Sequence, residues 1–154
     1  MPDGKTHYEA YKRGYVVEIP LSLALCFVDP KFALGNIVGY TFHRWCDNDW
    51  DLTTATASDG RAMRELPILG NFLFGISSTY SSFFRRTHRK VISHAPFIST
   101  AIRLFFVWLV PFIFLDSWGI NLIGGGWHMF WVGWYFGQSS ADAVHYYLDL
   151  THGD

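Results

Sequence analysis

The stretch FISTAIRLFFVWLVPFIFLDSWGINLIGGGWHMFWVGWYFG, residues 97–137, decides the fold. Its first part, residues 97–115, carries Arg103 as its only charge and would form about 28 Å of helix, enough to cross a bilayer. The second part, residues 119–137, contains no Asp, Glu, Lys or Arg and is rich in the Trp and Tyr side chains that favour membrane interfaces. Only residues 116–118 separate the two parts, which predicts an antiparallel pair of spanning helices.

A second, shorter hairpin is predicted nearer the start of the chain. Residues 16–28 and 32–45 are apolar, each long enough for about 20 Å of helix, and Asp29-Pro30-Lys31 separates them. Tilting or local bilayer thinning would accommodate helices of this length, and two buried helices of a soluble protein are the alternative. Basic residues precede the first segment, as in a signal peptide. Asp29-Pro30 stands where a cleavage site would be, so the segment is expected to be retained.

Residues 66–84 have a different pattern, with apolar side chains at spacings of three and four and the polar side chains largely elsewhere. This pattern predicts a helix that is apolar on one face and lies on the membrane surface, with a third spanning helix as the alternative. The sequence thus predicts a single all-α domain over residues 1–154. Its class is an integral membrane helical bundle of two helical hairpins plus an amphipathic interfacial helix.

The composition agrees with a membrane location. Half of the 154 residues are apolar and 16% are charged, against about 25% in soluble domains. The formal net charge of -1 gives no general attraction for phosphate backbones, so a nucleic-acid partner is not expected. The two cysteines, Cys26 and Cys46, have the spacing of neither a disulfide framework nor a zinc ribbon.

The basic residues predict which side of the membrane each segment faces. If the two hairpins span and residues 66–84 do not, Lys31 alone lies on one side. The other side receives Lys5, Lys12, Arg13, Arg44, Arg61, Arg64, Arg85, Arg86, Arg89 and Lys90. The positive-inside rule then places both termini and the loop of residues 46–96 in the cytoplasm.

The same arrangement gathers polar residues on the cytoplasmic side. They are His7, His43, His88, His94, His145, His152, Asp47, Asp49, Asp51, Asp142 and Asp149. Imidazole and carboxylate groups at the end of a helical bundle suit a divalent transition metal. Asp142, His145 and Asp149 would share one helix face. The three alternate aspartates after Cys46 would repel one another unless a cation lay among them. Each group also has a simpler interpretation. The three aspartates would form a solvated turn, Asp142 would cap a helix, and the basic residues 85–90 would meet lipid headgroups.

Four motifs, MPDGKTH, DWDL, HRKVISHAPFISTAIRLFF and HYYLDLTHG, resemble a family of small membrane proteins of unknown function that are described as metal-binding. More distantly, the chain resembles the YdjM-like inner-membrane proteins, a group of predicted metal-dependent hydrolases. The resemblance implies functional roles for His7, Asp49, Asp51, His88, His94, His145 and Asp149. Asp47-Asn48-Asp49 fits the Asp-x-Asp spacing as well as Asp49-Trp50-Asp51 does. Lys90-Val91-Ile92 makes the interval between the His-Arg and Ser-His pairs longer than in the hydrolase group.

These observations lead to a functional hypothesis with one alternative. The chain is expected to be a metal-dependent hydrolase of a lipid or lipid-linked ester, using zinc or another divalent transition metal at the cytoplasmic membrane surface. The expected metal ligands are His7, Asp47, Asp49, Asp51, His88, His94, His145 and Asp149, with Asp49 or Asp51 activating the water. The alternative is a non-enzymatic membrane subunit with a structural metal site, which would contact a membrane-protein partner or a second copy of the chain.

Overall fold

The computed structural model describes residues 4–46, 50, 63, 65–87, 95–122 and 124–152, and this part of the chain is helical with no strand. Four α-helices form two hairpins: α1 (Gly4–Leu25) with α2 (Pro30–Phe42), and α6 (Ile98–Ser117) with α7 (His128–His152). Between the hairpins lie α4 (Leu69–Phe84) and the short 3-10 helix η2 (Arg85–Thr87). The prediction of an all-α fold is therefore confirmed.

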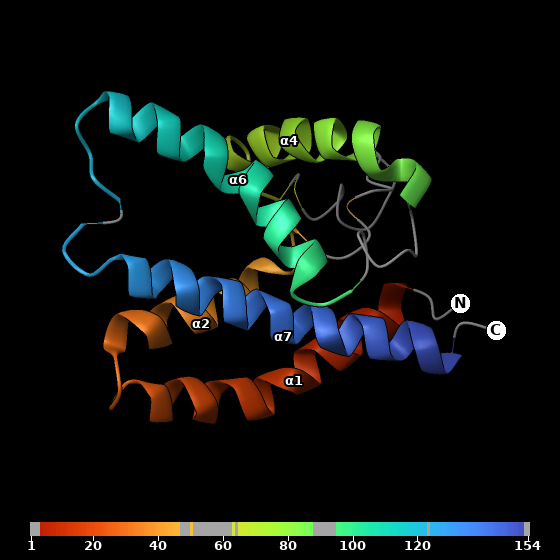
Figure 1. Ribbon diagram of the computed structural model, residues 1–154. Helices are drawn as coiled ribbons and strands as arrows, with labels where there is room; N and C mark the ends of the chain where they lie inside the picture. The colour runs from red at the N-terminus through yellow and green to blue at the C-terminus, as the bar shows by residue number, and fades with distance from the viewer. Residues whose placement is uncertain are drawn as a thin grey trace.

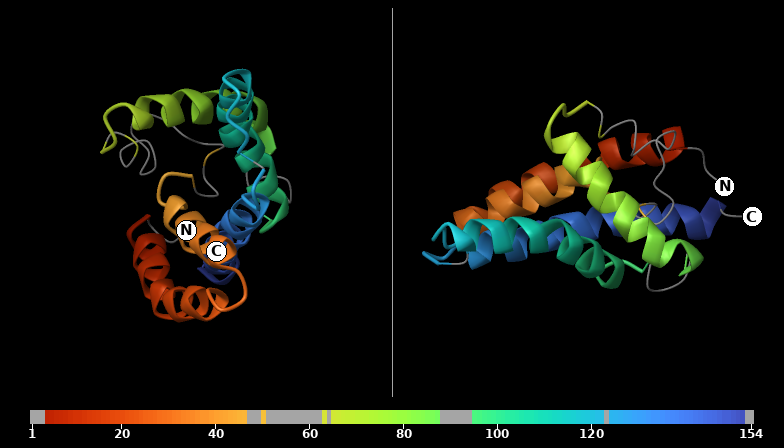
Figure 2. Two further views of the ribbon diagram at one scale, coloured as in Figure 1. Left: turned by 90° about the vertical axis from the view of Figure 1, so that its left-hand side faces the viewer. Right: turned by 90° about the horizontal axis from the view of Figure 1, so that it is seen from above.

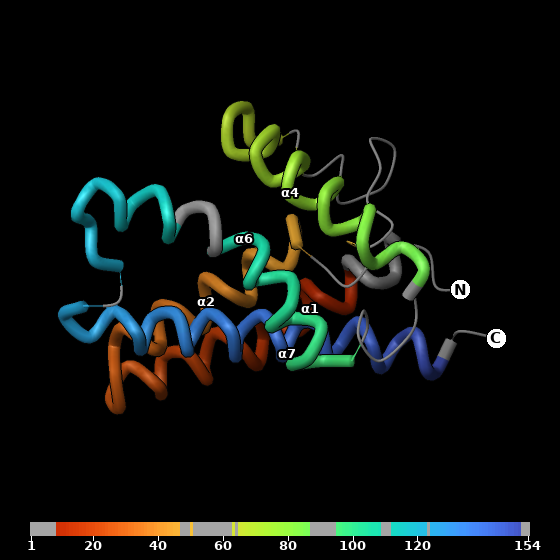
Figure 3. Tube along the Cα trace, turned by 45° about the horizontal axis from the view of Figure 1, so that its top comes forward, coloured from red at the N-terminus to blue at the C-terminus, as the bar shows by residue number. Residues whose placement is uncertain are grey.

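The helices form two layers. α1, α2 and α7 lie side by side in one layer, and α6 and α4 lie over it (Figures 1 and 2). The turns of both hairpins lie at one end of the molecule, and the N- and C-termini lie at the opposite end (Figures 1 and 3). We call these the turn end and the terminal end. α2 and α7 both run toward the terminal end, so the residues that follow α2 and the second half of α7 are brought together there.

The first hairpin turns where the sequence predicts. Asp29 caps α2, because its Oδ1 accepts hydrogen bonds from the backbone N–H groups of Lys31 at 2.8 Å and Phe32 at 2.9 Å. Pro30 occupies the first turn, where no backbone donor is needed. α1 starts at Gly4, well before the expected apolar segment, since the polar residues that precede residue 16 continue the same helix.

The connection in the second hairpin differs from the prediction of a link at residues 116–118. α6 continues to Ser117, and α7 begins only at His128. Gly119, Gly125 and Gly126 have positive φ angles of 75°, 61° and 80°, which a right-handed helix does not allow. The described residues of the segment 119–137 that precede His128 are thus not helical, and the prediction of one helix over its whole length is wrong.

α2 and α7 approach each other closely through glycines. Each helix carries two glycines four residues apart, Gly35 and Gly39 on α2 and Gly133 and Gly137 on α7. A Cβ atom on Gly39 would lie 2.0 Å from the Trp134 carbonyl oxygen, and one on Gly137 would lie 1.8 Å from the Asn36 carbonyl oxygen. Small residues at this spacing let two backbones come into contact, a common arrangement between membrane helices.

α4 is apolar on one side, as predicted for residues 66–84. Leu73 and Tyr80 are buried against the rest of the molecule, and Asn71, Ser78 and Ser82 are exposed. Two members of the predicted apolar stripe, Leu69 and Phe83, are exposed.

The distribution of polar and apolar side chains is unusual for a soluble domain. Twelve polar or charged side chains of the described residues are buried, as many as the apolar ones. Large apolar side chains are exposed on every α-helix, among them Val16 at 77%, Phe105 at 59% and Leu150 at 67%. Among the described residues, one helix, Ile98–Ser117, is long and apolar enough to cross a membrane by length and composition. The membrane bundle of two spanning hairpins stays a prediction.

Candidate functional site

A buried ionic cluster joins three helices near the terminal end, and Asp142 on α7 lies at its centre. Its side chain is fully buried. One carboxylate oxygen, Oδ2, accepts hydrogen bonds from Thr100 Oγ1 and Arg103 Nη2, both on α6. The other, Oδ1, lies 3.0 Å from Nδ1 of His43, which directly follows α2. Asp142 therefore ties the ends of α2 and α6 to α7.

The charge on Asp142 follows from these partners. Burial by itself would raise the pKa of the carboxyl, but the Arg103 guanidinium, His43 and Thr100 together hold the pKa of Asp142 below its usual value. Arg103 is also fully buried and forms an ion pair with Asp142. A buried charge is tolerated only with such a partner, so the two charged groups depend on each other.

Asp142 also fixes the orientation of the His43 ring. An ionised carboxylate is only an acceptor, so Nδ1 of His43 donates the hydrogen bond, and in the neutral imidazole Nε2 then carries the lone pair. A carboxylate that holds an imidazole in this way is the usual arrangement behind a metal-ligating histidine. The ring is buried and packs beside Tyr11, with a centroid distance of 5.5 Å. Burial and a hydrogen bond with Tyr15 raise the pKa of Tyr11 far above its usual value, which keeps the phenol neutral.

A second histidine lies beside the first. The ring centroids of His43 and His145 are 6.0 Å apart, and His145 is 5% exposed. Nε2 of His145 lies 3.4 Å from Oδ2 of Asp149, one turn further along α7. Asp142, His145 and Asp149 thus share one helix face, as their spacing predicts.

The remaining predicted site residues are distributed as follows. His7 belongs to the first turns of α1, toward the terminal end, and its side chain is not among those described. Five residues, Asp47, Asp49, Asp51, His88 and His94, lie outside the described residues. In the part of the chain that the structure describes, no group of three or more His, Cys, Asp or Glu side chains is arranged to hold a metal ion. His145 and Asp149 are the predicted ligands that the structure brings together.

The sequence reasoning missed the central contacts of the cluster. Thr100 carried no signal, because a threonine in an apolar helix usually bonds its own backbone. Arg103 did carry a signal: an arginine in an otherwise apolar segment is costly and requires a buried anionic partner. The carboxylate that pairs with Arg103, near the start of α6, is Asp142 in the second half of the next helix, α7. The sequence places His43 and Asp142 at the cytoplasmic side, but the predicted ligand set does not include them.

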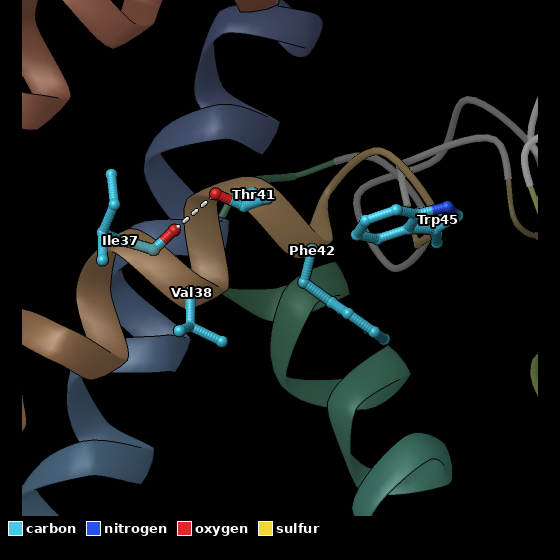
Figure 4. A pocket seen from close by; sticks show the side chains of 5 residues that line it. All are labelled: Ile37, Val38, Thr41, Phe42 and Trp45. Carbon is cyan, nitrogen blue, oxygen red and sulfur yellow. Dashed lines mark hydrogen bonds between the residues drawn. The ribbon is translucent and has the colours of Figure 1, made fainter. Parts of the chain in front are cut away.

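An apolar hollow of about 200 Å³ lies along the second half of α2. Figure 4 shows its lining, Ile37, Val38, Thr41, Phe42 and Trp45. Phe42 and Trp45 flank His43 in the sequence, but His43 is not part of this lining, because its ring faces Tyr11 and Asp142 instead. The Thr41 hydroxyl is directed at the backbone, with a hydrogen bond of 2.8 Å to the Ile37 carbonyl oxygen. The lining is therefore almost wholly apolar.

No family model matches the sequence, and searches of curated proteins and of solved structures gave no significant match. The resemblance noted from the sequence motifs therefore stays a prediction.

Proposed function

We propose that the chain is a membrane-embedded protein that binds a divalent metal ion at the terminal end of its helical bundle and hydrolyses a lipid or lipid-linked ester there. The observation that carries this proposal is the pair of buried histidines, His43 and His145, each beside a carboxylate, at the meeting point of α2, α6 and α7. Imidazoles oriented by carboxylates are a feature of metal centres.

Three features support the membrane location. The exposed surface is rich in large apolar side chains, while among the described residues polar and apolar side chains are buried in equal number. The α2–α7 contact uses the glycine spacing that membrane helices favour. α6 is long and apolar enough to span. The excess of Lys and Arg on the segments that meet the terminal end then favours an orientation with that end, and both termini, in the cytoplasm.

The residues present fit a metal ion in part. His145 and Asp149 supply one nitrogen and one oxygen donor on a single helix face, and Nε2 of His43 supplies a second nitrogen. The other proposed ligands, His7, Asp47, Asp49, Asp51, His88 and His94, would complete the set from segments that adjoin this end in the chain. A bound zinc-like ion would polarise a substrate oxygen and lower the pKa of a bound water. Asp142 would hold the His43 ring, with Arg103 keeping Asp142 ionised.

The apolar hollow supports a lipid as the substrate class. It lies along the second half of α2 and would take part of an acyl chain, while a polar headgroup would extend toward the terminal end. Arg85 and Arg86, in η2, are basic groups that could pair with an anionic headgroup on the same side.

The test is the metal content of the full chain purified in detergent after supply with zinc or another divalent transition metal. Wild type should retain the ion through dialysis, and His145→Ala should lose it or bind it at least about tenfold more weakly. The matched control is His128→Ala, an exposed histidine at the other end of α7, which should leave the metal content unchanged. Wild type without bound metal, or equal loss in both variants, would contradict the proposal.

The hydrolase activity requires its own measurement. Metal-loaded protein in lipid micelles should release product from a phospholipid or a lipid-linked phosphoester, and a chelator or His145→Ala should abolish the release. One observation favours a non-enzymatic subunit as the second candidate: Asp142 also serves as a clamp between three helices. Bound metal that raises the unfolding temperature without any hydrolysis would decide for that candidate.

A further inference from the structure

A second buried carboxyl, Glu18 on α1, lies outside the ionic cluster. It is 3% exposed although its chain neighbours Val16, Val17 and Ile19 are exposed apolar residues. Its side chain is therefore directed into the bundle, where it meets α2 and α7. Seven residues, about 10 Å of helix, separate its partner Asn36 from His43 along α2, so Glu18 is further from the terminal end than the ionic cluster.

Among the described residues, the polar contacts of Glu18 are with neutral groups. Oε1 accepts a hydrogen bond from Nδ2 of Asn36, and Oε2 lies 3.5 Å from the Ser140 hydroxyl on α7. Asn36 Nδ2 also lies 3.1 Å from Oγ of Ser22. Asn36 is held at the closest approach of α2 and α7, because a Cβ on Gly137 would lie 1.8 Å from its carbonyl oxygen. The Glu18 carboxyl thus contacts the Asn36 amide and the Ser140 hydroxyl, which are neutral groups held in place by helix packing.

Among the described residues, the cations on the surrounding helices do not reach Glu18: Lys12 pairs with Glu9, Lys31 donates to the Gly125 carbonyl oxygen, and Arg13 is exposed. On α1, Tyr11 and Tyr15 precede Glu18 and are hydrogen-bonded to each other. On α2 the nearest titratable group is Tyr40, whose hydroxyl donates to the Tyr11 carbonyl oxygen. On α7 the next are Asp142 and His145, and the one buried cation among the described residues, Arg103, is already paired with Asp142.

The two buried carboxyls therefore differ in a decisive way. Asp142 has a guanidinium partner and can remain ionised, whereas the partners of Glu18 in the described part of the chain are an amide and a hydroxyl. A buried charge without a counter-charge is so costly that the group takes up a proton instead. We propose that Glu18 is a proton-binding site of the bundle: it is protonated at neutral pH, and loss of its proton weakens the seating of α1 on α2 and α7.

Infrared spectroscopy of the full chain in detergent tests this proposal directly. Wild type at pH 7 should show the C=O stretching band of a protonated carboxylic acid, and the Glu18→Gln variant should lack it. Glu9→Gln is the matched control, because Glu9 is half exposed on the same helix and pairs with Lys12, and it should leave the band unchanged. Absence of the band from wild type at pH 7 would overturn the proposal. Loss of the band when sodium ions are added at constant pH would also overturn the proposal, in favour of a sodium site.

Two further measurements keep the test independent of how the variant folds. A hydrophobic carbodiimide adds the protonated carboxyl across its C=N bond, so peptide mapping of wild type should find the label on Glu18 and not on Glu9, with less label at high pH. Gln resembles a neutral Glu in shape, so Glu18→Gln should keep its unfolding temperature at pH 7 and lose part of the decline that wild type shows as the pH rises. Labelling that is equal at both residues, or identical pH profiles, would contradict the proposal. None of these readouts involves the proposed metal site.

Discussion

At the scale of single residues, Asp142 and Arg103 show how a charge can be kept inside an apolar bundle. Each is fully buried, and each supplies the counter-charge of the other. Thr100 and His43 satisfy the remaining capacity of the carboxylate. Such a cluster adds little net stability compared with apolar packing, but removing one member leaves the other charged and unpaired.

This mutual dependence predicts a large effect of Asp142→Asn. The variant should lose about 3–5 kcal/mol of unfolding free energy, because the Arg103 charge then lacks its carboxylate. Denaturation in detergent, followed by circular dichroism, measures the loss. Asp116→Asn is the control, since Asp116 is exposed near the end of α6 and should change stability little. Similar small effects of both substitutions would contradict the account of the cluster.

The same residue predicts a decline in stability in acid. Burial would raise the pKa of Asp142, but Arg103 and His43 hold this pKa below its ordinary value, so the folded state favours the carboxylate. Its stabilising effect is complete above the unfolded-state pKa of about 3.9 and is lost as the pH falls through the lower folded-state value. The unfolding temperature of wild type should therefore drop below about pH 4. Asp142→Asn should show a shallower drop, and equal slopes would count against the prediction.

At the scale of elements, the contact between α2 and α7 holds the first layer together. The backbones meet at four glycines, and the side chains on either side, among them Phe42 and Trp134, pack at a centroid distance of 5.0 Å. Because carbonyl oxygens occupy the space where a Cβ would lie, the helices can adopt this spacing only with glycine at these positions.

The glycine contact predicts opposite effects of the same substitution at two places. Gly39→Ala and Gly137→Ala should each destabilise the fold by about 1–3 kcal/mol or more, because the helices must move apart. Gly75→Ala on α4 is the matched control, since a Cβ added there would have no atom within 4 Å, and it should be neutral or stabilising by up to about 1 kcal/mol. Thermal unfolding of the three variants in detergent distinguishes them. Destabilisation by Gly75→Ala alone would show that the described packing is wrong.

Some helix boundaries could be predicted from the sequence and others could not. Asp29-Pro30 marks the first turn because a cap and an N1 proline are local signals, and the one-sided pattern of α4 is a local signal too. The start of α7 could not be placed from hydrophobicity. Gly124, Gly125 and Gly126 lie in a segment without charged residues, so the break in the helix has no counterpart in the hydropathy pattern. The partnership of Arg103 with Asp142 depends on how two helices pack, and spacing along one helix does not contain that information.

At the scale of the whole molecule, the two hairpins are arranged with both turns at one end and both termini at the other (Figure 1). The ionic cluster joins the helices toward the terminal end, and Glu18 lies deeper among α1, α2 and α7. The predicted convergence of His145 and Asp149 follows from their helix face. The other expected ligands lie outside the described residues, except His7 on α1, whose side chain is not described, and their convergence stays a prediction.

The central claim is that this bundle crosses a membrane with its terminal end in the cytoplasm, and cysteine accessibility in intact cells tests it most directly. Cys26 is exposed near the turn end, and Cys46 is buried. An impermeant maleimide should label Cys26 from outside. In a Cys26→Ser background it should label the Ser117→Cys variant but reach the Thr151→Cys variant only after the cells are permeabilised. Labelling of the Ser117→Cys and Thr151→Cys variants from the same side, or recovery of the chain in the soluble fraction, would contradict the account.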